Sequence, residues 1–149
     1  ASVSGEREIT IQNFYHGYKQ TDLKKGEYLK AIVIPKLSAQ QSLHIFKVSK
    51  RKDDDISAVL LAAMIEQDGK TIKDVRIACG GMAATPLHAL KTEQSLIGKP
   101  FTLNSFEQAS DLISKDYSPI KDVRASKEYR LAVAKNLIIK TGLECLGGL

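Results

Sequence analysis

The 149-residue chain has the composition of an ordinary soluble domain, with 43% hydrophobic and 26% charged residues. No apolar stretch approaches the roughly 20 residues that span a bilayer, and no signal peptide opens the chain, so neither a membrane nor a secretory role is indicated. Its two cysteines, Cys79 and Cys145, lie far apart without a CxxC motif, which is typical of reduced thiols in the cytoplasm.

The net charge of +5 is concentrated in the first third of the chain. Residues 1–52 carry ten Lys and Arg against four Asp and Glu, whereas residues 53–149 carry twelve against thirteen. Nucleic-acid-binding domains gather cations on one element with aromatic partners. Because this chain has no Trp and no zinc-finger spacing, we predict no nucleic-acid partner. The opening residues, ASVSG, lack an initiator Met, which indicates a processed end or a piece of a longer chain.

The first 50 residues predict short extended segments. Residues 8–11 alternate polar and apolar side chains, as an edge strand does. A second strand is predicted over residues 28–35, where a proline ends it because proline cannot donate to a ladder. Residues 36–42 are polar and predict a linker, after which residues 43–49 return to extended structure.

Residues 56–80 predict an antiparallel hairpin. The apolar run over residues 58–65 also fits a buried helix by composition, but Asp68-Gly69 after it is a strong hairpin turn signal. Beyond this turn, apolar and polar side chains alternate with the period of a strand, and a strand after a tight turn requires one before it.

Helices are predicted after the hairpin. Thr85-Pro86 supplies a cap and a proline at the first helical position, for a helix with Leu87, Leu90 and Ile97 inward. A capping box at Asn104 predicts a second helix. A third helix is predicted from about residue 126 to a glycine stop at position 142. Strands first and helices afterwards predict an α+β fold.

The most unusual segment is FKVSKRKDDDI, in which four cations run directly into three carboxylates. We name residues 50–55 the mixed-charge loop. Three interpretations are open: a solvated turn, a metal loop, or a loop at a site that needs both signs of charge. Consecutive carboxylates on an extended chain point to opposite faces, so Asp53, Asp54 and Asp55 do not converge on one ion without a turn.

No other pattern predicts chemistry by this chain alone. The three histidines lie on different elements without metal-ligand spacing, and no Cys-His pair is apparent in the sequence. Gly80-Gly81 lacks the further glycines and the lysine of a phosphate-binding loop, so we interpret it as a turn that needs unrestricted backbone angles. We therefore predict no catalytic residue and no metal ligand.

Several motifs, in order along nearly the whole chain, resemble one family. Between residues 14 and 35, this chain resembles the closing stretch of the FAD-binding domain of xanthine dehydrogenases, in the segments FYHGYKQT, EYL and IVIP. From Phe46 to residue 130, the chain resembles the C-terminal subdomain of the same flavoproteins. The matching segments are the one directly after Phe46 and then CGGMA, ALKT and DVRASKEYR. Within the molybdenum hydroxylase flavoprotein family, the resemblance indicates bacterial xanthine dehydrogenase small subunits as relatives. Carbon monoxide dehydrogenase medium subunits share the C-terminal fold.

The resemblance implies a fragment of an oxidoreductase. Residues 1–36 would be the tail of an FAD-binding domain, and residues 43–149 a carbon monoxide dehydrogenase flavoprotein C-terminal-like domain, with a three-stranded antiparallel sheet packed against a helical bundle. The complete enzyme would hydroxylate a purine at a molybdopterin centre and pass electrons through 2Fe-2S clusters and FAD to NAD.

The resemblance also implies partners, namely the rest of the flavin and iron-sulfur subunit and the molybdenum-binding subunit. The family's glycine-rich flavin segment and its cluster cysteines have no counterpart in these 149 residues. One flank of a cofactor site offers too little contact to hold FAD, so we expect the fragment alone to be inactive. The alternative from another class is a non-catalytic dimerisation or protein-interaction module, because fold does not fix function.

Two cofactor-binding residues are implied by the resemblance, Leu29 and Lys47. Without it, core packing would explain the leucine and a solvated strand cation the lysine. The mixed-charge loop matches a segment near the flavin ring, and its implied members are Arg51, Lys52, Asp53, Asp54 and Asp55. This chain has Lys52 and Asp53 where relatives often have Arg and Glu. The charges are the same, but a lysine cannot take the bidentate or stacking role of an arginine at position 52. We hypothesise that Arg51 and Lys52 act against Asp54 in setting the flavin's potential.

Overall fold

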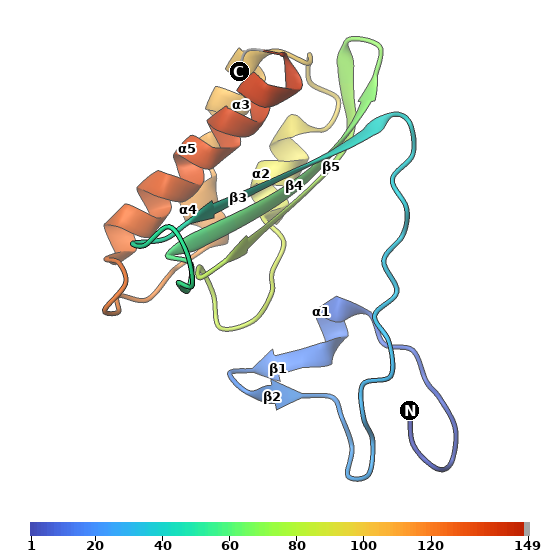
Figure 1. The fold of residues 1–149 in the computed structure, drawn as a ribbon. Coiled ribbons are helices and arrows are strands. Elements are labelled where there is room, and N and C mark those ends of the chain that lie inside the picture. Colours follow the sequence, from blue (N-terminus) through green and yellow to red (C-terminus); the bar gives the residue numbers. More distant parts are fainter. Residues whose placement is uncertain (148–149) are drawn as a thin grey trace.

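The computed structural model describes residues 1–147 and consists of a sheet covered by helices, preceded by an extended N-terminal region (Figure 1). The sheet has the strand order β3-β4-β5 and is antiparallel throughout. Its strands are β3 (Gln41–Val48), β4 (Val59–Asp68) and β5 (Thr71–Gly80). The predicted α+β fold with a three-stranded antiparallel sheet is confirmed. The last two positions of the predicted 43–149 domain lie outside the described residues.

The helices that follow the sheet in sequence lie together on one side of it (Figure 1). In chain order they are α2 (Leu90–Leu96), α3 (Leu103–Ser110), α4 (Ile113–Asp116) and α5 (Lys127–Cys145). The longest, α5, packs on β3 and β4 and also on α3, while α2 packs on β5. Thus one face of the sheet is buried beneath a helical layer.

The core forms between that layer and alternate residues of the two inner strands. Val59, Leu61, Ala63 and Ile65 of β4 are buried, while the residues between them are only half-buried. The matching apolar positions of β5 and the helices complete one cluster, including Ile77, Cys79, Leu96, Phe106, Ala134 and Ile138. Each large apolar side chain buried in this way stabilises the fold by about 1.5–3 kcal/mol relative to its exposure.

The hairpin prediction is confirmed, with its turn displaced by one residue. Asp68 still pairs with Thr71 in the ladder, so the turn itself is Gly69-Lys70 rather than Asp68-Gly69. Gly69 has φ 57°, a left-handed conformation that glycine adopts without steric cost.

The predicted helix after Thr85-Pro86 begins only at Leu90. The preceding residues instead run along the free edge of β5, where His88 forms a bridge to Ala78 and the Ala89 amide donates to the Ile77 carbonyl at 2.8 Å. The predicted inward face is also wrong. Leu87, Leu90 and Ile97 are exposed, and the buried members of this segment are Ala89, Thr92, Glu93 and Leu96.

The other two helices exist where predicted but differ at their ends. Thr102, not Asn104, precedes α3. Ser126 caps α5 by accepting from the Tyr129 amide at 3.1 Å, which confirms that start. Gly142 does not stop α5, which continues to Cys145. A Cβ at position 142 would lie 2.7 Å from the Phe106 ring, so this glycine allows α3 and α5 to approach closely.

The N-terminal region has little regular structure. It contains the short helix α1 (Ile11–Phe14) and the small hairpin of β1 (Tyr15–Gly17) and β2 (Gln20–Thr21). The strands predicted over residues 8–11 and 28–35 are wrong as strands, because these segments have no ladder partner among residues 1–147. Apolar side chains from Tyr28 to Ile34 are exposed.

Candidate functional site

The face of the sheet opposite the helices is open and largely apolar. Because directly paired residues share a face, the ladder aligns Leu43 with Met64, Ile45 with Ala62, and Lys47 with Leu60. Across β4 the same rows continue into β5, whose members there are Arg76, Ala78 and Gly80. Leu43 and Ile45 are 48% and 60% exposed. We name these nine residues the open sheet face.

The composition of the open sheet face suits a flat partner. Ala62 and Ala78 in the middle row have side chains too short to rise above the sheet, and Gly80 in the end row has none. A planar group can therefore approach the backbone closely there. Lys47 brings a positive charge to the same end, in the row that ends at Gly80. Small residues beside Lys47 therefore leave room for a planar group next to a positive charge.

The mixed-charge loop connects β3 to β4 at this end and is held by its own hydrogen bonds. The Arg51 amide donates to Asp55 Oδ2 at 2.9 Å, and the Ser49 hydroxyl donates to the Arg51 carbonyl at 2.7 Å. The bond from the Arg51 amide is the largest cause that lowers the pKa of Asp55. Asp54 has φ 48°, a left-handed conformation. The backbone that carries the three carboxylates therefore turns sharply at Asp54 and is not an extended strand.

An ion pair lies within the loop, while the hypothesis that Arg51 and Lys52 act against Asp54 on the flavin's potential stays a prediction. Arg51 pairs with Asp55, at 3.7 Å between Nη2 and Oδ1, and donates to the Asp54 backbone carbonyl at 3.2 Å. Lys52, Asp53 and Asp54 are exposed to solvent. The charge that opposes Arg51 is thus the half-buried Asp55, while the Asp54 carboxylate remains on the surface.

A buried arginine, Arg130 on α5, fixes the far end of this loop to two other segments. It is 2% exposed, and its Nη1 donates to the Ala58 carbonyl and, at 2.9 Å, to the Gly81 carbonyl. Its Nη2 donates to Asp122 Oδ1 at 2.6 Å. Hydrogen bonds from the Arg124 backbone, followed by those from Arg130, hold the pKa of Asp122 well below its usual range. We name Arg130 and Asp122, with these carbonyls, the arginine clamp.

The near end of the loop is tied to the same part of the molecule. Lys50 Nζ donates to the Val123 carbonyl at 2.8 Å, one residue beyond Asp122. Gly81 has φ 79°, and a Cβ there would lie 2.5 Å from the Ala58 carbonyl oxygen. The loop, the Gly80-Gly81 turn and the start of α5 therefore form one junction at the Lys47 end of the open sheet face.

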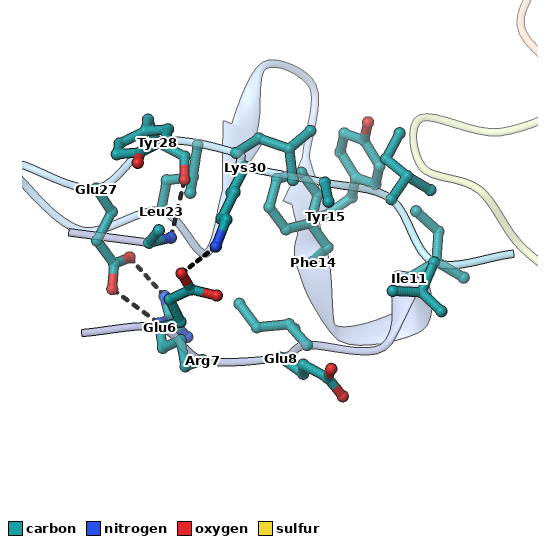
Figure 2. A pocket seen from close by; sticks show the side chains of 16 residues that line it. Glu6, Arg7, Glu8, Ile11, Phe14, Tyr15, Leu23, Glu27, Tyr28 and Lys30 are labelled. Carbon is teal, nitrogen blue, oxygen red and sulfur yellow. Dashed lines mark hydrogen bonds and ion pairs between the residues drawn. The ribbon is translucent and has the colours of Figure 1, made fainter.

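A second candidate site is a hollow of about 310 Å³ in the N-terminal region (Figure 2). Leu29 lines it, together with Ile32, Val33 and the aromatic residues Phe14 and Tyr15. Leu29 is nevertheless 55% exposed. Such an apolar hollow between extended segments is one half of a packing surface as well as a place for an apolar ligand.

Polar contacts at the mouth of the hollow hold its walls together, as Figure 2 shows for Arg7 and Glu27. Arg7 donates from Nε and Nη2 to the two Glu27 oxygens at 2.8 and 2.7 Å, and from Nη1 to Asp22 at 2.6 Å. The hydrogen bonds from Arg7 are the largest cause that lowers the pKa of Glu27 to about 2. Lys30 pairs with Glu6 across the same opening. These contacts link the segment at Glu6 and Arg7 to the segment that runs from Asp22 to Lys30.

The structure therefore places the predicted site residues on two surfaces. Leu29 lies in the N-terminal hollow, whereas Lys47 belongs to the open sheet face and is not among the residues that line that hollow. The mixed-charge loop accompanies Lys47. Sequence reasoning missed the arginine clamp, because a single Arg in an amphipathic helix carries no sign of its buried backbone acceptors. The motif DVRASKEYR, which contains both Asp122 and Arg130, was the one available signal.

Within residues 1–147, no group of three or more His, Cys, Asp or Glu side chains is arranged to hold a metal ion. No helix in the described part of the chain is long and apolar enough to cross a membrane.

The fold and the open sheet face define a class: an α+β domain that covers one face of its sheet with helices and leaves the other exposed. Residues 44–145 match the family described as the CO dehydrogenase flavoprotein C-terminal domain. Because this match covers more than half of the sequence, the chain belongs to that family. The family resemblance predicted from the sequence is confirmed.

Relatives are similar to this chain over most of its length. The glyceraldehyde dehydrogenase medium chain of Sulfolobus acidocaldarius is 30% identical, over 94% of this chain and 49% of that protein. The xanthine dehydrogenase FAD-binding subunit of Escherichia coli O157:H7 is 30% identical, over 99% of this chain and 52% of that subunit. The chain thus spans about half the length of the curated relatives it matches.

Solved structures share the fold. Quinoline 2-oxidoreductase from Pseudomonas putida 86 superimposes with a TM-score of 0.84 at 27% identity, over 99% of this chain and 51% of that one. Carbon monoxide dehydrogenase from Hydrogenophaga pseudoflava gives a TM-score of 0.85 at 28% identity, over 93% of this chain and 48% of that one.

Proposed function

We propose that this chain is the C-terminal half of an FAD-binding subunit of a molybdenum hydroxylase, and that the open sheet face borders the flavin. Residues 1–36 are then the tail of the FAD-binding domain, and the domain from residue 43 carries Lys47. The open sheet face carries this proposal: it is a largely apolar surface, with short side chains beside Lys47 at one end and Arg76 at the other, in a family of flavoprotein domains. When bound, FAD would supply reversible hydride and electron transfer.

Under this proposal the residues of the open sheet face, the mixed-charge loop and the N-terminal hollow have separate physical roles. Lys47 stabilises the negative charge that a flavin gains on reduction, while Ile45 and Leu43 exclude water from the ring. The mixed-charge loop, with Arg51 paired to Asp55, sets the local field beside an approaching charged nucleotide. Leu29 and the apolar strip that follows it pack against the other part of the flavin domain. The chain contributes binding and electrostatics and leaves the redox chemistry to the cofactor.

The Lys47 role has a direct test in the complete flavoprotein. For Lys47→Met we expect the flavin midpoint potential to fall by about 35 mV, since a unit charge about 10 Å away at an effective dielectric of about 20 contributes about 1.7 kcal/mol. The matched control is Lys135→Met on α5, where Lys135 pairs with Asp111 in the helical layer. Spectroelectrochemical titration of the two variants measures the effect, and equal potentials in both would refute the proposal.

The finer proposal is a xanthine dehydrogenase-like enzyme of the cytoplasm that oxidises a purine and reduces NAD. Its support is the xanthine dehydrogenase FAD-binding subunit among the relatives and the motifs before residue 36. Relatives with other substrates, such as glyceraldehyde dehydrogenase, make substrate the decisive measurement. We expect the enzyme assembled with its iron-sulfur and molybdenum subunits to reduce NAD with xanthine faster than with glyceraldehyde or quinoline. The reverse order would retain a molybdenum hydroxylase but exclude the purine assignment.

A further inference from the structure

A Cys-His-Glu arrangement lies on the helix-covered face of β3, away from the open sheet face. His44 on β3 and Cys145 on α5 are 101 residues apart in sequence, yet His44 Nε2 lies 3.1 Å from the Cys145 sulfur. On the other side of the ring, His44 Nδ1 lies 2.9 Å from Glu144 Oε2. The sequence showed no such pair because strand pairing and the end of α5 bring these residues together only in the folded chain.

The geometry assigns a role to each of the three groups. A carboxylate beside Nδ1 fixes the tautomer in which Nδ1 carries the hydrogen, so Nε2 presents its lone pair. That lone pair faces the Cys145 thiol and is also 3.1 Å from the Ser42 hydroxyl. A nucleophile within hydrogen-bond distance of a base, with the base oriented by a third group, is the arrangement that activates serine and cysteine nucleophiles.

The surroundings of the sulfur make the base necessary. Burial raises the pKa of the Cys145 thiol, with the nearby Glu144 charge acting in the same direction, so the sulfur keeps its proton at neutral pH. Cys145 is only half-buried, and the exposed residues Leu146 and Gly147 follow it. Cys145 is therefore only partly covered by the core it packs against, and His44 Nε2 lies within reach of its proton.

We propose that Cys145 is a modification site, a thiol that His44 and Glu144 activate toward small hydroperoxides. In this step the sulfur attacks one peroxide oxygen, so that an S–O bond forms as the O–O bond breaks. The thiol proton passes to His44 and then to the departing oxygen, which leaves as water or an alcohol. The sulfur is oxidised by two electrons to a sulfenic acid and the peroxide is reduced by two. The reaction needs no flavin.

The chain contains its own reference thiol. Cys79 is buried in the core, where burial raises its pKa to about 12, and the Tyr117 hydroxyl rather than a histidine accompanies it. A thiol without a base and without access to solvent should react only when the domain opens. The difference between the two cysteines therefore separates local activation at Cys145 from general unfolding.

The experiment treats the native protein with hydrogen peroxide, traps sulfenic acid with dimedone, and follows both cysteine peptides by mass spectrometry. We expect Cys145 to be labelled at least about tenfold faster than Cys79, and His44→Asn to slow Cys145 by at least about tenfold. Glu144→Gln should slow it less, because His44 Nε2 still faces the sulfur in that variant.

A purely structural contact between β3 and α5 predicts a different result. In that case His44→Asn would lower the unfolding midpoint while the labelling rate of Cys145 stayed the same or rose, which would overturn the proposal. Thermal unfolding of each variant is measured alongside the labelling. If His44→Asn does not fold, Glu144→Gln decides: an unchanged pH profile of Cys145 labelling in that variant also overturns the proposal.

Discussion

Replacing Arg130 with Met is expected to lower the free energy of unfolding by about 3–5 kcal/mol, because it breaks a buried charged network while leaving its partners in place. The Ala58 and Gly81 carbonyls would lose their shared donor, and Asp122 would lose its shortest contact. The side chain is 3% exposed, so water cannot replace those hydrogen bonds without opening the junction.

Arg124→Ala is the matched control, because Arg124 also pairs with Asp122, at 3.2 Å, but from a much more exposed side chain. We expect this variant to lose less than about 1 kcal/mol. Urea unfolding measures both variants, and hydrogen exchange of the mixed-charge loop should rise in Arg130→Met alone. Equal stability losses in the two variants would mean that the arginine clamp does not hold the junction.

The arginine clamp also predicts how acid affects the junction. Asp122 has a pKa below its usual range in the fold, so its charged form is favoured there relative to the unfolded chain. Its contribution is therefore complete above the ordinary carboxyl pKa and is lost as the pH falls below that value. Acid should loosen the mixed-charge loop before it disrupts the apolar core, and hydrogen exchange of the loop amides measured as the pH is lowered checks this order.

Local patterns were sufficient to predict the hairpin of β4 and β5, whereas the three-stranded sheet was implied by the family resemblance. The period-two alternation after Asp68-Gly69 depends only on neighbours in sequence, and the antiparallel hairpin followed from it. Helix α5 was predicted for the same reason, since Ser126 caps its own helix. The end of α5 was not predicted. Position 142 requires glycine because a Cβ there would clash with Phe106 on α3, and no local signal in the sequence reveals this contact.

Tertiary contacts likewise explain why α2 begins late and why the N-terminal strands are absent from the described residues. His88 and Ala89 bond to the edge of β5, and this pairing takes priority over the cap and proline at Thr85-Pro86. Residues 28–35 have the composition of a strand but no ladder partner within residues 1–147. A strand needs its neighbour, and a chain that spans half of its relatives' length need not contain that neighbour.

The candidate site was predictable only in part. Family motifs pointed to Lys47 and the mixed-charge loop, and the structure places them at one end of the open sheet face. The role of Leu29 stays a prediction, on a separate surface. The pairing of Arg51 with Asp55 rather than Asp54 depends on the left-handed turn at Asp54, which charge patterning does not show.

Gly81→Ala is expected to lower the free energy of unfolding by about 2–4 kcal/mol, from left-handed backbone strain together with a steric clash. The new Cβ would lie 2.5 Å from the Ala58 carbonyl oxygen and 2.8 Å from Arg130 Nη1, inside the arginine clamp. Since neither the Ala58 backbone nor a buried guanidinium can move away freely, the junction itself must shift.

The neighbouring glycine supplies the control for this prediction. A Cβ on Gly80 would meet only Leu60, at 3.5 Å from its Cβ, an ordinary contact, and Gly80 is not among the glycines with positive φ. Gly80→Ala should therefore change stability by less than about 1 kcal/mol. Because Gly80 belongs to the open sheet face, however, the added methyl should weaken flavin binding in the complete flavoprotein. Urea unfolding and flavin titration of both variants separate the two effects: a Gly80→Ala protein that is stable and binds flavin normally would place the cofactor elsewhere.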